Sequence, residues 1–190
     1  AEDAHGYNVA IGQEALKVQN AGANAYNTAV GYHAGLSVTT GIKNTFIGGL
    51  AGDAITIGFN NVALGYDAMG ANTASGANVA IGYQSLLVYN NTSEASHFNT
   101  AVGTQSGKAL STGVENTLIG GLVGDALTDA DYNTAIGFAS LSSDTQGSRT
   151  TAIGYGTLNN QNFTTATDSF NTAVGFNAGT AVTTGINNTL

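Results

Sequence analysis

The sequence predicts an all-β protein, a parallel β-solenoid of about ten coils. A five-residue pattern, seen at residues 27–31 as Asn-Thr-Ala-Val-Gly, recurs along the whole chain, and self-similarity at so short an interval is typical of solenoids. β-Branched residues alternate with alanine inside the pattern, which favours short strands. Glycine contributes 27 of the 190 residues and charged residues only 8%. Disordered chains are poor in β-branched and aromatic residues, so this composition indicates a chain that packs.

Each copy of the pattern predicts one strand that ends at a glycine. Successive glycines recur at a solenoid-like period of about 17 to 21 residues. They are Gly12, Gly31, Gly48, Gly65, Gly82, Gly103, Gly120, Gly137, Gly154 and Gly175. Strand side chains alternate between two faces, so the second and fourth residues of the pattern share one face and the third residue points the opposite way. We expect the β-branched face to line the interior of each coil, with these residues inside: Val9, Ile11, Val30, Ile47, Leu64, Ile81, Val102, Ile119, Ile136, Ile153 and Val174.

A second pattern follows each glycine. It is usually an aromatic residue, a variable residue, a small residue and a larger apolar residue, as in Tyr66-Asp67-Ala68-Met69. We expect a second short strand there, so that two strands and two turns make one coil. Stacked at about 4.8 Å, ten such coils give a rod about 48 Å long.

A longer period, four coils in length, lies over the short one. Residues 27–98 and 99–170 align without a gap, each as three short coils followed by a longer one. A third, partial unit covers 171–190, and residues 1–26 correspond to the end of a preceding unit, so we treat 1–190 as a single repeat array.

The extra residues of each fourth coil, 87–98 and 159–170, are rich in Asn, Ser and Thr and predict surface loops. The two loops are four coils apart, so we expect them to project from the same edge of the rod about 19 Å apart. Because exposed variable loops often carry binding function, candidate contact residues for a receptor or a neighbouring fibre are Tyr89, Asn91, Glu94, His97, Asn162 and Asp168.

The repeat resembles two related families. The motif Asn-Val-Ala-Ile-Gly, intact at 8–12 and 78–82, resembles the head repeat of trimeric autotransporter adhesins, the YadA-like left-handed parallel β-roll. The run Thr-Gly-Ile-Lys-Asn-Thr-Phe-Ile-Gly at 40–48 is more similar to repeats of phage tail-fibre proteins, which form shaft or receptor-binding regions. The resemblance covers the whole chain. It implies that each chain makes one β-roll and that three rolls pack about an axis as a homotrimer, with the aliphatic positions of the motif inside each roll.

The third position of the motif is where we expect this trimer axis. Alanine there lets three rolls approach closely, and a large apolar residue replaces it in the second coil of each unit. A monomer would expose this column as a regular apolar stripe, which soluble monomers seldom display. The expected axis residues are Phe46, Leu118, Leu190, Ala29, Ala63, Ala80, Ala101, Ala135 and Ala152.

The charge balance argues against several classes of partner. With a formal net charge of -8 and only four Lys plus Arg residues, the chain has no basic patch for the phosphates of a nucleic acid. Its apolar runs are far shorter than the roughly 20 residues of a membrane span, so no membrane insertion is expected. The chain has no cysteine, which excludes disulfides and thiolate metal sites.

No enzyme site and no cofactor is predicted. The run 48–53 is similar to the calcium-binding nonapeptide G-G-x-G-x-D, but its register is shifted by one position and it occurs once in four coils. We interpret it as a turn, and calcium at Asp53 or Asp125 stays an open alternative. The other carboxylates are dispersed among turns. His5, His33 and His97 share no position in the repeat, so they do not predict a metal site.

Two further patterns have a structural and a functional interpretation. The aromatic residues after the glycines predict packing between coils, with a glycan-binding face as the alternative. Stacked threonines on a flat solenoid face would suit ice binding. Because threonine interchanges with valine and shares its face with isoleucine, we interpret the threonine column as interior instead.

The sequence therefore predicts a homotrimeric shaft or head segment of an extracellular fibre, above all a phage tail fibre, that spans distance and presents a surface to a host receptor or glycan. A bacterial trimeric autotransporter adhesin head is the first alternative. A monomeric ice- or calcium-binding solenoid is the alternative from another class.

Overall fold

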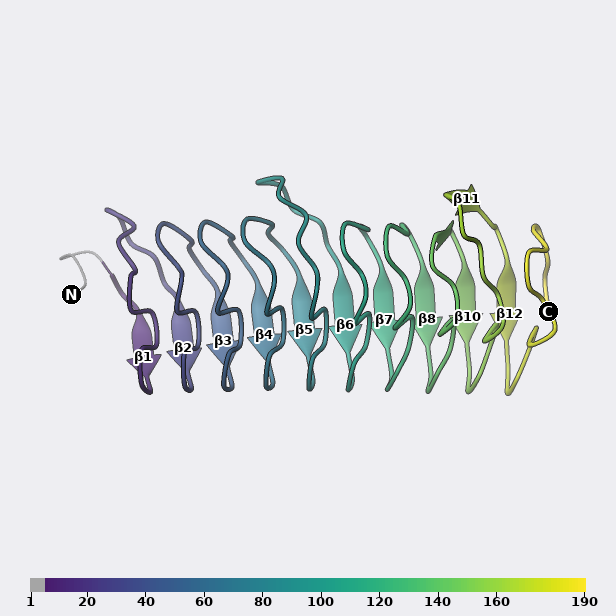
Figure 1. Cartoon of the computed structure of the whole chain (residues 1–190), viewed down its shortest axis with the longest axis horizontal. Helices are drawn as coiled ribbons and strands as arrows, with labels where there is room; N and C mark the ends of the chain where they lie inside the picture. Colours follow the sequence, from purple (N-terminus) through teal and green to yellow (C-terminus); the bar gives the residue numbers. More distant parts are fainter. Residues whose placement is uncertain (1–5) are drawn as a thin grey trace.

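A computed structural model describes residues 6–190 and confirms the predicted fold class. These residues contain no helix, and they form a parallel β-solenoid whose coils stack along one axis (Figure 1). Ten short strands make one parallel sheet in the order of the sequence, and only the small strands β9 and β11 lie outside it. The sheet contains β1 (Val9–Ile11), β2 (Thr28–Val30), β3 (Thr45–Ile47), β4 (Val62–Leu64), β5 (Val79–Ile81), β6 (Thr100–Val102), β7 (Thr117–Ile119), β8 (Thr134–Ile136), β10 (Thr151–Ile153) and β12 (Thr172–Val174).

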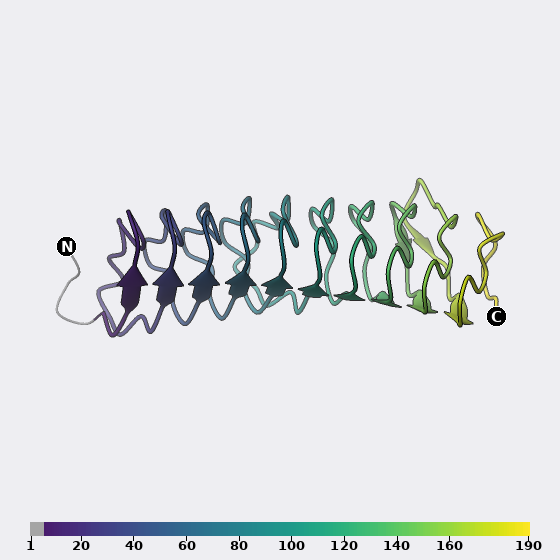
Figure 2. The same cartoon turned by 90° about the horizontal axis from the view of Figure 1, so that it is seen from below.

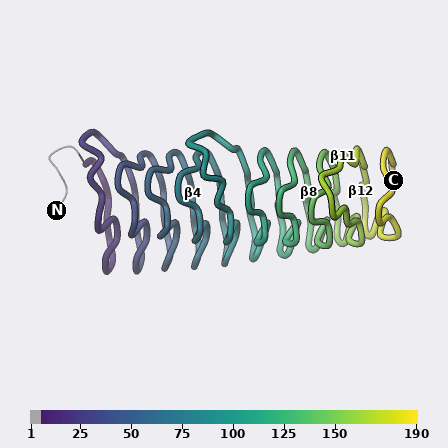
Figure 3. The backbone as a smooth tube through the Cα atoms, turned by 45° about the horizontal axis from the view of Figure 1, so that its top comes forward, coloured from purple at the N-terminus to yellow at the C-terminus, as the bar shows by residue number. Residues whose placement is uncertain are grey.

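A second, two-stranded parallel sheet pairs β9 (Gly147–Ser148) with β11 (Thr167–Asp168). β11 lies in the long loop 159–170 of the last complete unit, and β9 lies in the coil before it. This loop and the teal loop that follows β5 extend beyond the outline of the other coils on the same side of the rod, as expected (Figures 1 and 3). Between these two projections the trace of the coils is uniform.

A glycine closes each strand because no side chain fits there. At Gly48 the backbone φ is +130°, a conformation that residues with a side chain rarely adopt. An added Cβ would also lie 2.6 Å from the carbonyl oxygen of Gly65 in the next coil. The column of glycines therefore lets successive coils stack with their backbones in direct contact.

A ladder of buried asparagines joins each coil to the next. Asn44 Oδ1 accepts a hydrogen bond from the backbone N–H of Asn61 at 3.0 Å, and Asn61 Oδ1 accepts one from the backbone N–H of Asn78 at 3.1 Å. Asn61 Nδ2 also donates to the carbonyl oxygen of Ser75 on the far wall of its own coil at 2.9 Å. One amide thus satisfies backbone groups of two coils. The ladder contains Asn27, Asn44, Asn61, Asn78, Asn99, Asn116, Asn133, Asn171 and Asn188.

The residues after each glycine form turns, so the predicted second strand is wrong. Asp67 and Met69 have φ of 59° and 54°, and Gln84 and Leu86 have φ of 53° and 49°. Two left-handed residues separated by one other residue bend the chain at once, which an extended strand cannot do. The variable and the large apolar residues of this pattern therefore mark a tight double turn.

The interior is filled by complementary pairs of large and small residues. Where the strand supplies Ala63 or Ala80, the turn of the same coil supplies Met69 or Leu86, and all four are fully buried. Where the strand supplies Phe46, the turn has a glycine, because a Cβ at position 52 would lie 2.5 Å from the Phe46 ring. Position 124 is likewise glycine, and a Cβ there would lie 3.0 Å from the side chain of Leu118. The four-coil period is therefore a packing period inside the coil.

The predicted interior is wrong for the fourth position of the motif and for Val9. Several of these side chains are exposed, including Ile11 at 59% and Leu64 at 41%, and the others are half-buried on the outer face. The residues that lie outside rather than inside are Val9, Ile11, Val30, Ile47, Leu64, Ile81, Val102, Ile119, Ile136, Ile153 and Val174.

The predicted trimer axis is wrong for the same reason, since the third position of the motif, the middle residue of each strand, points into its own coil. The residues fully buried there are Ala29, Ala63, Ala80, Ala101, Ala135, Ala152, Phe46 and Leu118. Leu190 is 49% exposed, but its side chain lies against Gly179 of the preceding coil. Alternation shows which residues share a face but not which face is inside. The coil is so narrow that the inward position accepts nothing larger than alanine unless a glycine stands opposite.

We expect Asn61→Ala to destabilise the fold by about 2 to 6 kcal/mol, because it leaves the buried Ser75 carbonyl and Asn78 N–H unpaired at roughly 1 to 3 kcal/mol each. Asn160→Ala is the matched control, since Asn160 is exposed and donates one hydrogen bond to the carbonyl of Thr180. We expect that variant to lie within about 0.5 kcal/mol of the parent. Denaturant unfolding measures both, and equal effects would contradict the role of the ladder.

Candidate functional site: an exposed apolar strand face

The outer face of the ten-stranded sheet is the main candidate site. The second and fourth residues of the motif, which are the first and last residues of each strand, point outward and form two columns, one of Thr and Val and one of Ile, Val and Leu. The pairing register places these residues directly over one another, so that Leu64 pairs with Ile47 on one side and Ile81 on the other. The result is a continuous, largely apolar surface along the whole sheet.

Aromatic residues that follow the glycines flank this surface along one edge. The ring centroids of Tyr66 and Tyr83 are 6.0 Å apart, and those of Tyr155 and Phe176 are 5.3 Å apart, with nearly parallel planes. The rings thus pack between coils, as expected from the sequence. Each also remains about half exposed or more, so the rings extend the apolar surface: Tyr32, Tyr66, Tyr83, Phe138, Tyr155 and Phe176.

A second aromatic column flanks the opposite edge, and we did not predict it from the sequence. Its rings occupy the residue before some of the ladder asparagines, at Tyr26, Phe98, Tyr132 and Phe170. This position has a left-handed φ, for example 55° at Tyr26 and 52° at Phe98. Tyr26, Phe98 and Phe170 are 52%, 61% and 54% exposed. These three residues recur once in each four-coil unit, so the longer period of the sequence could have identified them.

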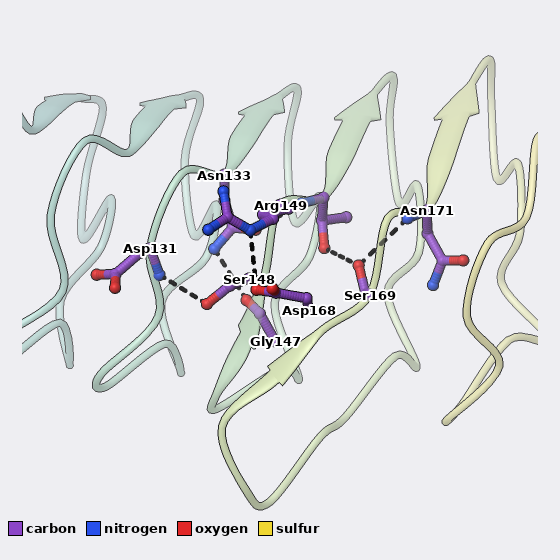
Figure 4. A network of polar contacts seen from close by, with 9 residues as sticks. Asp131, Asn133, Gly147, Ser148, Arg149, Asp168, Ser169 and Asn171 are labelled. Atoms are coloured by element: carbon purple, nitrogen blue, oxygen red, sulfur yellow. Dashed lines mark hydrogen bonds and ion pairs between the residues drawn. The ribbon is translucent and has the colours of Figure 1, made fainter.

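One part of this second column has a polar covering. The guanidinium of Arg149 lies 4.6 Å from the centre of the Tyr132 ring, and its Nε is 3.0 Å from the Asp168 carboxylate. Figure 4 shows this ion pair beside the β9–β11 sheet, where Ser148 Oγ accepts a hydrogen bond from the backbone of Asp131. Asp168, a predicted contact residue, is thus exposed but already paired.

We call the outward strand residues and the two aromatic columns together the strand face. Six residues from one column to the other span about 20 Å, and ten coils span about 48 Å, so the strand face covers roughly 1,000 Å². Figure 2 shows that the face turns along the rod, because the strand arrows are seen broadside at the N-terminal end and nearly edge-on in the middle of the rod.

The two projecting loops hold only some of the predicted contact residues at the surface. Glu94, Asn162 and Asp168 are exposed and Asn91 is half-buried. Tyr89 and His97 are 0% and 5% exposed, so their prediction as contact residues is wrong. Both side chains fold back under the loop and anchor it to the coil.

These two anchors form an unusual buried cluster. The rings of Tyr89 and His97 meet edge to face with centroids 6.1 Å apart. Within the described residues, the Tyr89 hydroxyl, His97 Nδ1 and Asn72 Nδ2 are buried without a hydrogen-bond partner. Burial accordingly raises the pKa of the Tyr89 phenol and lowers the pKa of His97. An unpaired buried polar group costs free energy, so this loop is held less firmly than its contacts suggest.

The corresponding positions of the second unit are fully paired. Gln161, which replaces Tyr89, donates to Asp144 Oδ2 at 2.6 Å, and Asp144 Oδ1 accepts from the backbone of Phe163 at 2.9 Å. Ser169, which replaces His97, lies 2.7 Å from the hydroxyl of Thr150. The same loop thus has two alternative anchors, one aromatic and one hydrogen-bonded.

The described residues contain no group of three or more His, Cys, Asp or Glu side chains that could hold a metal ion. Desolvation raises the pKa of both Asp53 and Asp125, and the neighbouring Asp67 adds to the shift at Asp53. His33 lies 3.2 Å from Glu14, and His5 is outside the described residues. Asp53 and Asp125 stand four coils apart, so they cannot share an ion.

Comparison with known proteins gives no relative: no family model, no curated protein and no solved structure matches the chain. Among the described residues there is also no helix long and apolar enough to cross a membrane. The strand face therefore has to be interpreted from its own chemistry.

We expect the chain to lose stability as the pH falls below about 6.5. Because burial holds the pKa of His97 below its ordinary value of 6.5, the unfolded chain takes up the proton first, and the stability present above pH 6.5 declines toward the lower, folded-state pKa. Thermal melts at pH 7.5 and 5.5 measure the effect. His97→Gln removes the titrating group and should flatten the dependence between these two values; an unchanged slope would assign it to other groups.

Proposed function

We propose that this chain is a rigid segment of an extracellular fibre in which identical copies pack side by side through the strand face, as a homotrimeric shaft or head of a phage tail fibre. The single observation that carries the proposal is the exposed apolar face along the whole rod. In this role the protein spans distance and holds the projecting loops at fixed heights, where they contact a cell-surface receptor or glycan.

The size of the strand face supports a permanent partner. Soluble monomers rarely expose a contiguous apolar patch larger than a few hundred Å². A stable interface needs about 800 Å² from each partner, and the strand face offers roughly 1,000 Å². The described part of the chain has few charges on this face, with Lys43, Glu115 and Arg149 at its edge. That composition fits a permanent interface better than a transient one.

The direction of the strand face supports a rotation axis along the rod. The face runs the full length of the sheet, so only copies that lie parallel or antiparallel cover all of it. Closed cyclic symmetry around an axis parallel to the rod covers it in every copy and leaves no free edge. The similarity of the motif to tail-fibre and adhesin repeats implies that the number of copies is three. A bacterial trimeric adhesin head would pack its copies around an axis in the same way, and it is the alternative within this class.

One observation favours a candidate from a different class. The threonines Thr100, Thr117, Thr134, Thr151 and Thr172 lie on the outer face of consecutive strands of the main sheet, and not inside as expected. An outward threonine column suits ice binding by a monomer. The gradual turn of the face (Figure 2) and the exposed rings along both edges suit a flat crystal surface poorly, so assembly is the better-supported function.

We expect the double variant Ile81→Asp and Ile119→Asp to remain folded and to dissociate the assembly. Both side chains point outward, so the carboxylates stay hydrated in a single chain but would be buried between copies at a cost of several kcal/mol. Val88→Asp is the control, because Val88 is an exposed apolar residue on a projecting loop. Light scattering gives the molar mass and circular dichroism the fold. A parent chain that is monomeric at every concentration would refute the proposal, and ice shaping by that monomer would favour the rival.

A further inference from the structure

Two glycines on the strand face are not required by the fold of the chain. Gly49 and Gly121 directly follow the strand-closing glycines, but neither has a φ in the left-handed region. A Cβ at Gly49 would lie 3.5 Å from the Tyr66 ring, and one at Gly121 would lie 3.4 Å from the Phe138 ring. These are ordinary contacts or nearly so. By contrast, the preceding glycine at position 48 tolerates no side chain.

Each of these glycines replaces a ring in the first aromatic column. Other coils of the same column carry Tyr66, Tyr83 and Tyr155, whose rings stack on their neighbours at 5.3 to 6.0 Å along the rod. At Gly49 one ring is missing, which leaves room for about one ring beside Tyr66, since two coils span about 9.6 Å. At Gly121 the preceding coil carries Thr104 in place of a ring, so the gap before Phe138 is wider by one coil. The column therefore has a notch at Gly49 and another at Gly121, four coils apart.

The opposite edge of the strand face carries projections with the same period. Tyr26 and Phe98 are 52% and 61% exposed, and they are separated by one four-coil unit, as are Gly49 and Gly121. The step along the chain from Tyr26 to Gly49 equals the step from Phe98 to Gly121. The offset along the rod is a little more than one coil, roughly 5 to 7 Å, which the side chain of a Phe or Tyr can bridge.

Cyclic symmetry brings these two edges together. When parallel copies are related by a rotation axis along the rod, one edge of each strand face meets the opposite edge of the next copy at the same height. We propose that Tyr26 and Phe98 of one copy insert into the Gly49 and Gly121 notches of its neighbour and so fix the register of the fibre. This inference rests on the proposed assembly of identical chains and names the contacts that align them.

The first test closes the notches with a residue that the same position carries elsewhere in the chain. We expect the double variant Gly49→Tyr and Gly121→Tyr to fold at least as stably as the parent, because each new ring can stack on Tyr66 or Phe138. The assembly should dissociate at a protein concentration at least tenfold higher. Gln13→Tyr is the control, since it adds a ring to the same column at an exposed position away from both notches.

The second test locates the contact directly. With p-benzoylphenylalanine at position 98, irradiation of the assembled protein should join it to the peptide of a neighbouring copy that contains Gly121. Mass spectrometry of the proteolysed dimer band identifies the site. Capture near position 98 of the neighbour would instead place the projections against one another, and capture in a loop would place them outside the interface.

The outcomes separate this inference from the function on which it rests. A parent chain that never assembles refutes both. An assembly that tolerates filled notches, or that cross-links from position 98 to any site other than Gly121 and its neighbours, keeps the proposed fibre and overturns the interlock. Loss of assembly in the filled variant together with capture at Gly121 supports both.

Discussion

The buried asparagine ladder is the interaction on which the rest of the structure depends. Each solenoid coil contains many backbone groups that no strand partner satisfies, because the strands of the main sheet are so short. One side chain, with one acceptor and two donors, bonds the backbone of the next coil and the far wall of its own coil. Where Thr150 takes the place of asparagine, Gln161 and Ser169 contact its hydroxyl group, so the chain compensates for the exchange locally instead of leaving polar groups unpaired.

Much of this architecture follows from the sequence, and the direction of the strand side chains does not. The spacing of the glycines predicts the coils, and the alternation of Val79-Ala80-Ile81 predicts a strand whose outer residues share one face. Because valine and isoleucine are more hydrophobic than alanine, hydrophobicity alone then suggests that they are inside. The deciding fact is the width of the coil, which depends on the turn after the glycine. Met69 and Leu86 occupy the interior from that side, and only alanine fits opposite them.

The candidate site could be predicted only in part for a related reason. The loops were predictable from their composition and length, but the inward orientation of Tyr89 and His97 was not, because an Asn- and Ser-rich segment gives no sign of which side chains return to the core. The strand face could be recognised only after the structure showed that the second and fourth residues of the motif point outward. Gly49 and Gly48 are adjacent and identical in the sequence, and only the backbone conformation shows that one is obligatory and the other is not.

The complementary packing of Phe46 against glycines has an evolutionary consequence. Its ring lies against Gly35 of the preceding coil as well as Gly52 of its own, so the coils of one unit are matched to specific neighbours. Duplicating or removing a whole unit of four coils recreates every junction, whereas gaining or losing a single coil brings interior residues together that are not matched in size. Such a protein can change its reach in steps of about 19 Å by recombination between units, without adjusting a single core residue.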